Sequence, residues 1–239
     1  MYKNQRTLAV VPARGGSKGV HLKNLHPLCG KPLLAYTADV IHQLAYFDRA
    51  VVSTDHQQIA QVAREHNLSV VYRPEELSGD RIGDWDVLDH ALREAEREDG
   101  VLYDVVVMLQ PTSPLRKAEH VRATIEKCVD GNWDAVWTVS PTDLKYHPLK
   151  ALIIDENGAM DLYDARGKQI IARQQLQPVY HRNGVAYALT RDCILNQKTI
   201  MGANWSAVVI EEPQISIDTL EDFAKVEKLM KSSSAKAIS

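Results

Sequence analysis

Cysteine is scarce, long apolar runs are missing, and positive charge is not in excess. The three cysteines, Cys29, Cys128 and Cys193, lie far apart and form no Cys-x-x-Cys pair, which excludes a disulfide framework and a cysteine-based zinc site. The apolar run near residue 10 is too short for a signal peptide, and no run reaches the length of a membrane span. The formal net charge of -3 argues against a protein that coats nucleic acid. We therefore expect a cytoplasmic protein without nucleic-acid or membrane partners.

Short valine-rich runs alternate with amphipathic stretches along the 239 residues, which are enough for one sizeable core. Apolar residues recur three and four positions apart, as on one face of a helix, within 59–66, 87–95 and 121–129. This alternation predicts an α/β fold with a Rossmann-like, mostly parallel sheet flanked by helices. The predicted buried strands are Leu8–Pro12, Ala50–Ser53, Val70–Tyr72, Val105–Leu109 and Ala135–Val139.

The alternation of valine-rich runs and amphipathic stretches is interrupted over about residues 143–182. Turn signals at Glu156–Gly158 and Ala165–Gly167 separate short apolar pieces there. We interpret this stretch as a small β-rich excursion inserted in a single domain of residues 1–231. One small domain would have difficulty burying these apolar side chains, whereas a second copy of the chain would cover them, so we expect a homodimer. Residues 232–239 are polar and small and are predicted to form a disordered tail.

A glycine-rich, basic loop follows the first predicted strand. Ligands of open α/β sheets bind beyond the carboxyl ends of the strands, so the loop stands where a site is expected. Its glycines allow backbone N–H groups to converge on phosphate oxygens, and its lysines and arginine add positive charge. A flexible surface turn with solvated charges is the alternative. The loop consists of Ala13, Arg14, Gly15, Gly16, Ser17, Lys18 and Gly19, and Lys23 and Asn24 follow it.

The loop matches neither of two common nucleotide-binding patterns. Gly30-Lys31 is followed by Pro32 and lacks the earlier glycine of a Walker A motif, and the loop contains no Gly-x-Gly-x-x-Gly. These differences exclude kinase-like and dehydrogenase-like interpretations.

A series of motifs, in order, resembles those of the CMP-sialic acid synthetases, also called acylneuraminate cytidylyltransferases. The resemblance spans about residues 6 to 230. It implies displacement at the α-phosphorus of CTP by the anomeric hydroxyl of a nine-carbon 2-keto sugar acid of the sialic acid type, release of pyrophosphate, and a need for Mg²⁺ or Mn²⁺. The motifs are Arg14–Lys18, Lys23–Leu25, Gly30–Leu34, Ser53–Asp55, Arg73–Leu77, Gln110–Arg116, His147–Lys150, Arg173–Leu176, Asn183–Tyr187 and Ile217–Thr219.

The resemblance implies catalytic roles for the cations of the loop. A hydroxyl that attacks a polyanion needs the repulsion neutralised and its approach fixed. Arg14 and Lys18 are therefore expected to bind the triphosphate, and Lys23 to reach oxygens on the other side of the nucleotide. Main-chain groups near Ala13 and Arg14, together with the segment Ser78–Ile82, are the candidates for recognising cytosine that the resemblance implies. The nucleotide-binding set that the resemblance implies is Ala13, Arg14, Gly15, Gly16, Ser17, Lys18, Asn24 and Asp80.

The residues after the strand Val105–Leu109 are expected to meet the sugar. The resemblance makes Gln110 a contact to the sugar acid, places Thr112 in the same set, and makes Arg116 either structural or anion-facing. Ser/Thr-Pro is also typical of a helix N-terminus, and we expect Ser113 to cap a helix that begins near Arg116.

The metal site departs from the pattern of the family. Its members usually carry Asp-Ile-Asp before the last helix, two carboxylates on one face of a strand, whereas this segment reads Ser216-Ile217-Asp218. Mg²⁺ can be held by one or two carboxylates together with phosphates and water, so Asp218 is the expected metal ligand and the fourth member of the catalytic set. The alternative is that Asp218 caps the helix Leu220–Met230.

Two further departures leave alternatives open. His181-Arg182 replaces the usual arginine or aromatic residue before the Asn-Gly turn, and Arg182 is placed in the sugar-binding set. Asp84 and Asp86 replace small hydroxyl residues, so they either face sugar hydroxyls or amines or form the exposed start of a helix. We prefer the second interpretation for this pair.

Polar residues of the excursion are expected to complete the site of the other subunit. The resemblance implies that this region crosses the dimer interface. Lys150, Arg173 and Gln174 would then meet the sugar in the partner's site. Arginine is suited to bidentate capture of a planar carboxylate. An interface ion pair without ligand contact is the alternative for Arg173.

Three other functions compete with this one. Activation of another acid sugar, such as the eight-carbon Kdo, also attaches CMP, but the first loop and Arg173-Gln174-Gln175 favour the nine-carbon class. A sugar-1-phosphate nucleotidylyltransferase would carry a longer glycine-rich stretch and different carboxylates. A catalytically inactive nucleotide-binding homologue is supported only by the hydroxyl of Ser216 in place of a carboxylate.

Overall fold

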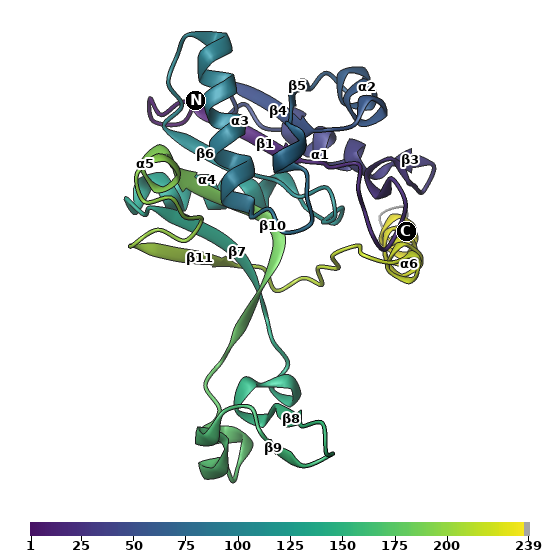
Figure 1. Cartoon of the computed structure of the whole chain (residues 1–239), viewed down its shortest axis with the longest axis vertical. Coiled ribbons are helices and arrows are strands. Elements are labelled where there is room, and N and C mark those ends of the chain that lie inside the picture. The colour runs from purple at the N-terminus through teal and green to yellow at the C-terminus, as the bar shows by residue number, and fades with distance from the viewer. Residues whose placement is uncertain (237–239) are drawn as a thin grey trace.

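A seven-stranded sheet lies between two layers of helices in the computed structural model, which describes residues 1–236 (Figure 1). The strand order is β11-β7-β10-β6-β1-β4-β5. Only β10 runs antiparallel to its neighbours in this sheet, so the predicted mostly parallel α/β fold and its five predicted strands are confirmed. The strands are β1 (Thr7–Pro12), β4 (Arg49–Thr54), β5 (Ser69–Tyr72), β6 (Val105–Met108), β7 (Ala135–Pro141), β10 (Tyr180–Thr190) and β11 (Trp205–Val209).

Helices cover both faces of the sheet because successive side chains of a strand point to opposite sides. Ala9 and Val11 of β1 pack on one face with α1, α2 and α4, whereas Leu8 and Val10 pack on the other with α3 and α5. The three predicted helices are confirmed, while α1 and α5 were not predicted from the pattern. The bounds are α1 (Leu33–His42), α2 (Gln57–Glu65), α3 (Asp84–Asp99), α4 (Ala118–Asp130) and α5 (Arg191–Leu195).

The last helix, α6 (Leu220–Lys236), packs beside the small hairpin of β2 (Pro27–Leu28) and β3 (Lys31–Pro32). Phe223 of α6 is buried in the same cluster as Leu28. The predicted disordered tail begins at residue 232, whereas α6 continues to Lys236, and residues 237–239 lie outside the described part of the chain. No helix within residues 1–236 is long and apolar enough to cross a membrane.

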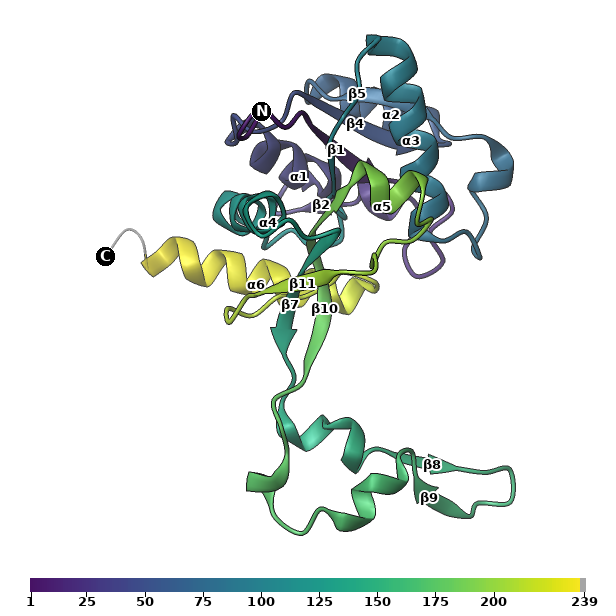
Figure 2. The same ribbon diagram turned by 90° about the vertical axis from the view of Figure 1, so that its left-hand side faces the viewer.

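A small lobe projects from the sheet on a ribbon formed by the ends of β7 and β10 (Figures 1 and 2). It coincides with the predicted excursion, but its only strands among the described residues are the hairpin of β8 (Leu152–Ile154) and β9 (Met160–Leu162). The rest is built around four 3-10 helices. Asp143, His147 and Asp164 each accept a hydrogen bond from a backbone N–H two residues on, which favours tight turns over extended chain.

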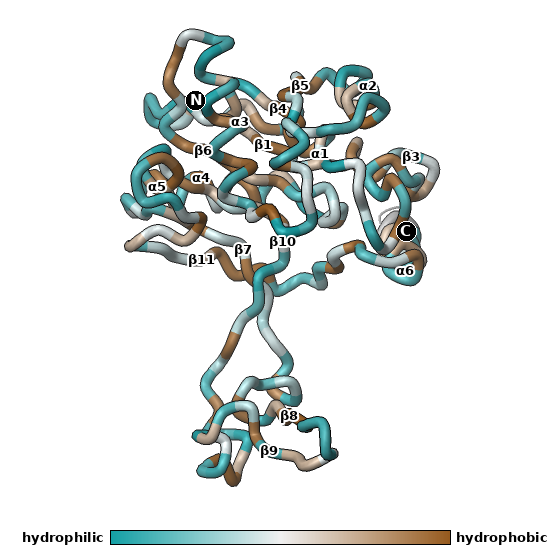
Figure 3. Tube along the Cα trace, in the orientation of Figure 1, coloured by the Kyte–Doolittle hydropathy of each residue, from teal (hydrophilic) through white to brown (hydrophobic). Residues whose placement is uncertain are grey.

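The lobe leaves most of its large apolar side chains in contact with solvent. Figure 3 shows hydrophobic segments distributed over it. Ile154 is 70% exposed, Met160 65% and Ile171 92%, whereas Leu176 is buried. A patch of this kind on a thin lobe is typical of a protein interface.

Candidate active site

A cavity of about 670 Å³ lies at the edge of the sheet where the parallel strands end. Pro12 ends β1, Arg73 follows β5 and Gln110 follows β6, and all three line the cavity. This edge is where ligands of open α/β sheets bind. The structure brings the following predicted residues together around the cavity: Arg14, Ser17, Lys18, Lys23, Asn24, Asp80, Gln110, Thr112 and Asp218.

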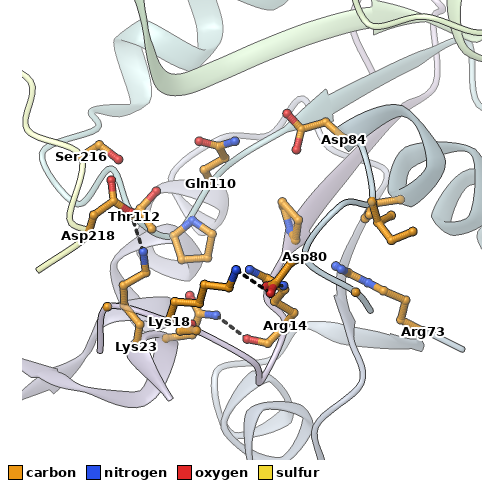
Figure 4. A pocket seen from close by; sticks show the side chains of 18 of the residues that line it. Arg14, Lys18, Lys23, Arg73, Asp80, Asp84, Gln110, Thr112, Ser216 and Asp218 are labelled. Atoms are coloured by element: carbon orange, nitrogen blue, oxygen red, sulfur yellow. Dashed lines mark hydrogen bonds and ion pairs between the residues drawn. The ribbon is translucent and has the colours of Figure 1, made fainter. Parts of the chain in front are cut away.

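Two cations of the basic loop meet one carboxylate. Arg14 Nη1 lies 2.7 Å from one oxygen of Asp80, and Lys18 Nζ lies 2.7 Å from the other (Figure 4). The hydrogen bonds from Lys18 and from Arg14 lower the pKa of Asp80. Guanidinium and ammonium donors therefore converge on one anionic group at this wall, which is the arrangement that binding of a phosphate requires.

Lys23 and Asp218 face each other on another wall of the cavity. Lys23 Nζ lies 2.8 Å from Asp218 Oδ1 (Figure 4). The lysine side chain is 14% exposed and the carboxylate side chain 72%, so the carboxylate has the freer access to solvent and to a ligand.

The cap of α6 is supplied by other residues than Asp218. Asp222 Oδ2 accepts hydrogen bonds from the backbone N–H groups of Thr219, at 2.9 Å, and of Asp218, at 3.1 Å. In return Thr219 Oγ1 accepts from the N–H of Asp222 at 3.3 Å, which completes a capping box. Because this pair satisfies the helix end, the carboxylate of Asp218 is left to the cavity, and the alternative role as a cap is wrong.

The cavity holds a set of oxygen donors that fits a hard divalent cation. Ser216 lines it beside Asp218, so a hydroxyl and a carboxylate are available in one place (Figure 4). Mg²⁺ accepts such donors and completes its coordination with phosphate oxygens and water.

The backbone of the loop is bonded mostly to the protein itself. The N–H of Gly15 donates to Asp55 Oδ1 at 2.8 Å, and Asn24 Nδ2 donates to the carbonyl oxygen of Arg14 at 3.1 Å. Ala13 is buried, and its N–H donates to the carbonyl oxygen of Ser53 at 2.9 Å. Ala13, Gly15 and Gly16 do not line the cavity. The N–H of Gly15 is thus paired with a carboxylate of the protein, and the expected convergence of loop N–H groups on phosphate stays a prediction.

Arg116 holds the wall that carries Gln110. It is buried, and its guanidinium donates to Thr37 Oγ1 at 2.8 Å and to the carbonyl oxygens of Gln110 and Val185 at 2.5 Å. Burial lowers the pKa of Arg116 to about 9, so the group remains cationic at neutral pH. Of the two roles left open for Arg116, the structure supports the structural one.

A bulge in β10 lies against Gln110. The pairing of β10 with β7 shifts register between Arg182 and Tyr187, and Gly184 has a φ of +70° there. A Cβ at Gly184 would lie 2.5 Å from Gln110 Oε1 and would displace that amide, while the positive φ at this position favours glycine. Ser113 Oγ donates to the carbonyl oxygen of Asn183 at 3.0 Å.

Ser113 does not cap a helix. The next helix, α4, begins at Ala118, and His120 Nδ1 accepts from the N–H of Lys117 at 3.3 Å at its start. The prediction that Ser113 caps a helix near Arg116 is wrong, because its hydroxyl is used across the sheet instead.

Arg73 is a cavity residue to which the sequence assigned no role. It is buried, and it donates to Ser53 Oγ at 3.2 Å and to the carbonyl oxygen of Ser53 at 3.0 Å. Burial lowers the pKa of Arg73. The available signal was its place directly after β5, at the same edge as the other site residues.

Four predicted sugar-binding residues do not line this cavity. Lys150, Arg173 and Gln174 belong to the lobe, beyond the ribbon of β7 and β10 (Figure 1). The guanidinium of Arg182 lies over the ring of Trp137, 5.9 Å from its centroid. The neighbouring His181 is bonded through Nδ1 to Thr142 Oγ1 at 2.9 Å.

Fold and cavity together define an α/β protein whose sheet edge carries converging cations and a group of oxygen donors. Residues 8–237 match the family described as cytidylyltransferase. The CMP-N,N'-diacetyllegionaminic acid synthase of Legionella pneumophila is 36% identical over 94% of this chain and 96% of its own length. The N-acylneuraminate cytidylyltransferase of Streptococcus agalactiae serotype V is 34% identical over 92% of this chain. The chain belongs to the CMP-sialic acid synthetase family of cytidylyltransferases.

The match to the streptococcal protein covers 52% of that protein, so this chain spans about half the length of that relative. Among solved structures, a CMP:2-keto-3-deoxy-manno-octonic acid synthetase complexed with CTP has a TM-score of 0.73 at 16% identity and covers 95% of this chain and 99% of its own. A 4-diphosphocytidyl-2C-methyl-D-erythritol synthase from Anaerococcus prevotii has a TM-score of 0.63 at 16% identity, covering 95% and 96%. These two likenesses show a shared fold.

Proposed function

We propose that this chain transfers CMP from CTP to the anomeric hydroxyl of a nine-carbon 2-keto sugar acid of the sialic acid type and releases pyrophosphate. The observation that carries the proposal is the cavity itself, in which Arg14 and Lys18 converge on one anion and Lys23 faces Asp218. The names of the relatives from Legionella pneumophila and Streptococcus agalactiae favour the nine-carbon class over Kdo. A cytoplasmic location stays a prediction.

The reaction requires neutralisation of a polyanion. On binding of CTP, Arg14 and Lys18 would exchange the carboxylate of Asp80 for triphosphate oxygens, and Lys23 would approach from the other wall. A bond forms between the anomeric oxygen and the α-phosphorus, and the bond from the α-phosphorus to the bridging oxygen breaks. Pyrophosphate leaves with that oxygen, and the hydroxyl proton passes to water. Gln110 is the proposed contact that orients the sugar acid.

Asp218 and Ser216 are the residues that would hold Mg²⁺ or Mn²⁺. When bound there, the cation supplies further neutralisation of the charge on the phosphates. Asp218 is paired with Lys23, so this pair would have to separate or be shared before the carboxylate becomes a ligand.

A homodimer with composite sites is part of the proposal. The lobe exposes apolar side chains that a second copy would cover, and it carries Lys150, Arg173 and Gln174 away from the cavity of its own chain. Arg173 would then meet the sugar carboxylate in the partner's site.

The test is a pyrophosphate-release assay with CTP, Mg²⁺ and, in separate reactions, Kdo or one of four nine-carbon acids: N-acetylneuraminate, KDN, legionaminate or pseudaminate. We expect release with at least one of them and formation of the matching CMP-sugar, seen by mass. Release with Kdo alone would move the chain to the eight-carbon class. Binding of CTP without release in the presence of every acid would support the inactive homologue instead.

A further inference from the structure

The two carboxylates at the start of α3 lie in different surroundings. Asp86 Oδ2 accepts a hydrogen bond from the N–H of Gly83 at 3.1 Å and so closes the first turn of the helix. Asp84 lines the cavity instead. The preferred interpretation of this pair as an exposed helix start therefore holds for Asp86 and fails for Asp84.

The carboxylate of Asp84 has no partner of its own within residues 1–236. It accepts no hydrogen bond there and forms no ion pair. Figure 4 shows it directed toward Gln110, on the side of the cavity away from Lys18. Burial raises the pKa of Asp84, and the positive charges of Arg182 and Arg73 act in the opposite direction. A half-buried carboxylate without donors is costly unless a ligand supplies them.

The chemistry of this carboxylate limits what it can bind. An ionised carboxylate only accepts hydrogen bonds, so it recognises O–H and N–H groups and repels a phosphate or a second carboxylate. The phosphate-binding cations Arg14 and Lys18 lie on the far side of the cavity. The space between Asp84 and Gln110 is thus suited to the hydroxyl or amide N–H groups of an acid sugar and unsuited to its carboxylate.

We propose that Asp84 is a specificity-determining residue that accepts a hydrogen bond from a hydroxyl or amide N–H of the sugar acid. This inference rests on the proposed function. It adds which groups of the sugar, the hydroxyl or amide N–H groups, are recognised at the wall that carries Asp84. The sugar carboxylate is then left to a cationic group elsewhere in the assembled site.

The test compares Asp84→Ala, the conservative Asp84→Asn and the matched control Asp86→Asn. The affinity of each of the four acids for the CTP-loaded protein is measured by calorimetry, beside turnover. Loss of one hydrogen bond to a charged group predicts that Asp84→Ala weakens sugar affinity roughly 10- to 100-fold. The KM for CTP stays at the wild-type value, Asp84→Asn recovers part of the loss, and Asp86→Asn leaves sugar affinity unchanged while lowering the melting temperature.

The outcomes separate this inference from the reaction. If the wild-type protein binds an acid but does not turn it over, and Asp84→Ala binds it less tightly, the inference stands and the proposed transfer fails. Equal sugar affinity in Asp84→Ala and wild type overturns the inference and leaves the transfer intact. A raised KM for CTP in Asp84→Ala assigns the residue to the nucleotide and also overturns it. If no acid binds the wild-type protein, both fall.

Discussion

Lys23 and Asp218 meet across the cavity although 195 positions separate them in the chain, with Nζ and Oδ1 2.8 Å apart. The loop after β1 and the segment before α6 approach each other closely at this point. A Cβ added to Gly19 would lie 2.2 Å from the carbonyl oxygen of Asp218, so the approach depends on a glycine in the loop. The contact brings a cation and the expected metal ligand to one wall of the site.

Replacement of Asp218 by asparagine is expected to abolish metal-dependent pyrophosphate release and to leave the fold intact. The amide keeps the shape of the side chain but removes the negative charge that a divalent cation requires. Activity is measured over a series of Mg²⁺ concentrations and stability by thermal denaturation. The matched control is Asp222→Asn, which weakens the capping box and is expected to cost about 1 kcal/mol of stability while activity persists. Full activity of Asp218→Asn at ordinary Mg²⁺ would place the metal elsewhere.

Ser216→Asp is expected to be tolerated and to shift the metal optimum. It adds a second carboxylate beside Asp218 and restores the pattern usual in the family, on a residue that already lines the cavity. The measurement is the Mg²⁺ and Mn²⁺ dependence of turnover. An unchanged metal dependence in an active variant would mean that residue 216 does not reach the cation.

Lys18→Ala and Arg14→Ala are expected to reduce turnover far more than stability. Each removes a preorganised donor, worth roughly 10²–10³ in rate, while the partly exposed ion pairs with Asp80 contribute little to folding. Turnover with the accepted sugar and the melting temperature are measured together. Lys225→Ala is the control, because Lys225 forms a comparable exposed pair with Glu221 at 2.9 Å on α6. Near-normal turnover in either loop variant would refute the role assigned to that residue.

Thiol labelling is expected to modify one cysteine in the native protein and three after unfolding. Cys29 is exposed, whereas burial raises the pKa of Cys128 and of Cys193 to about 12. A raised pKa lowers the thiolate population at pH 8, and burial also blocks the reagent. The count of labelled thiols at pH 8 is read by mass spectrometry with and without denaturant. Rapid labelling of two or three thiols in the native protein contradicts the burial of Cys128 and Cys193.

Activity is expected to return when two inactive variants, Lys18→Ala and Arg173→Ala, are mixed under conditions that let subunits exchange. In a mixed dimer with composite sites, both lesions fall in one site and the other site is whole. Pyrophosphate release is followed over time, and exchange is verified by mass. Each variant incubated alone is the control. If exchange occurs and activity stays absent, Arg173 acts within its own chain and the composite-site model is wrong.

The alternation of valine-rich runs and amphipathic stretches was enough to predict the sheet, three of its covering helices and the edge that carries the site. Strands and helices of this kind follow from local periodicity, and the carboxyl ends of parallel strands always meet at one edge. The resemblance to the family, and not local periodicity, implied that Arg14, Lys18, Gln110 and Asp218 belong to one site, and all four line the cavity.

Contacts between distant segments were decided only by the tertiary structure. Sequence spacing could not separate Asp84 from Asp86, since both fit the first turn of a helix, yet packing turns one toward the cavity and the other toward the backbone of Gly83. The hydroxyl of Ser113 likewise bonds to the carbonyl oxygen of Asn183, 70 positions away. A side chain that could bond to a local partner bonds instead to a distant one when the fold places a buried carbonyl oxygen within reach. The reason is that a buried polar group without a hydrogen bond destabilises the folded state more than the loss of a helix cap does.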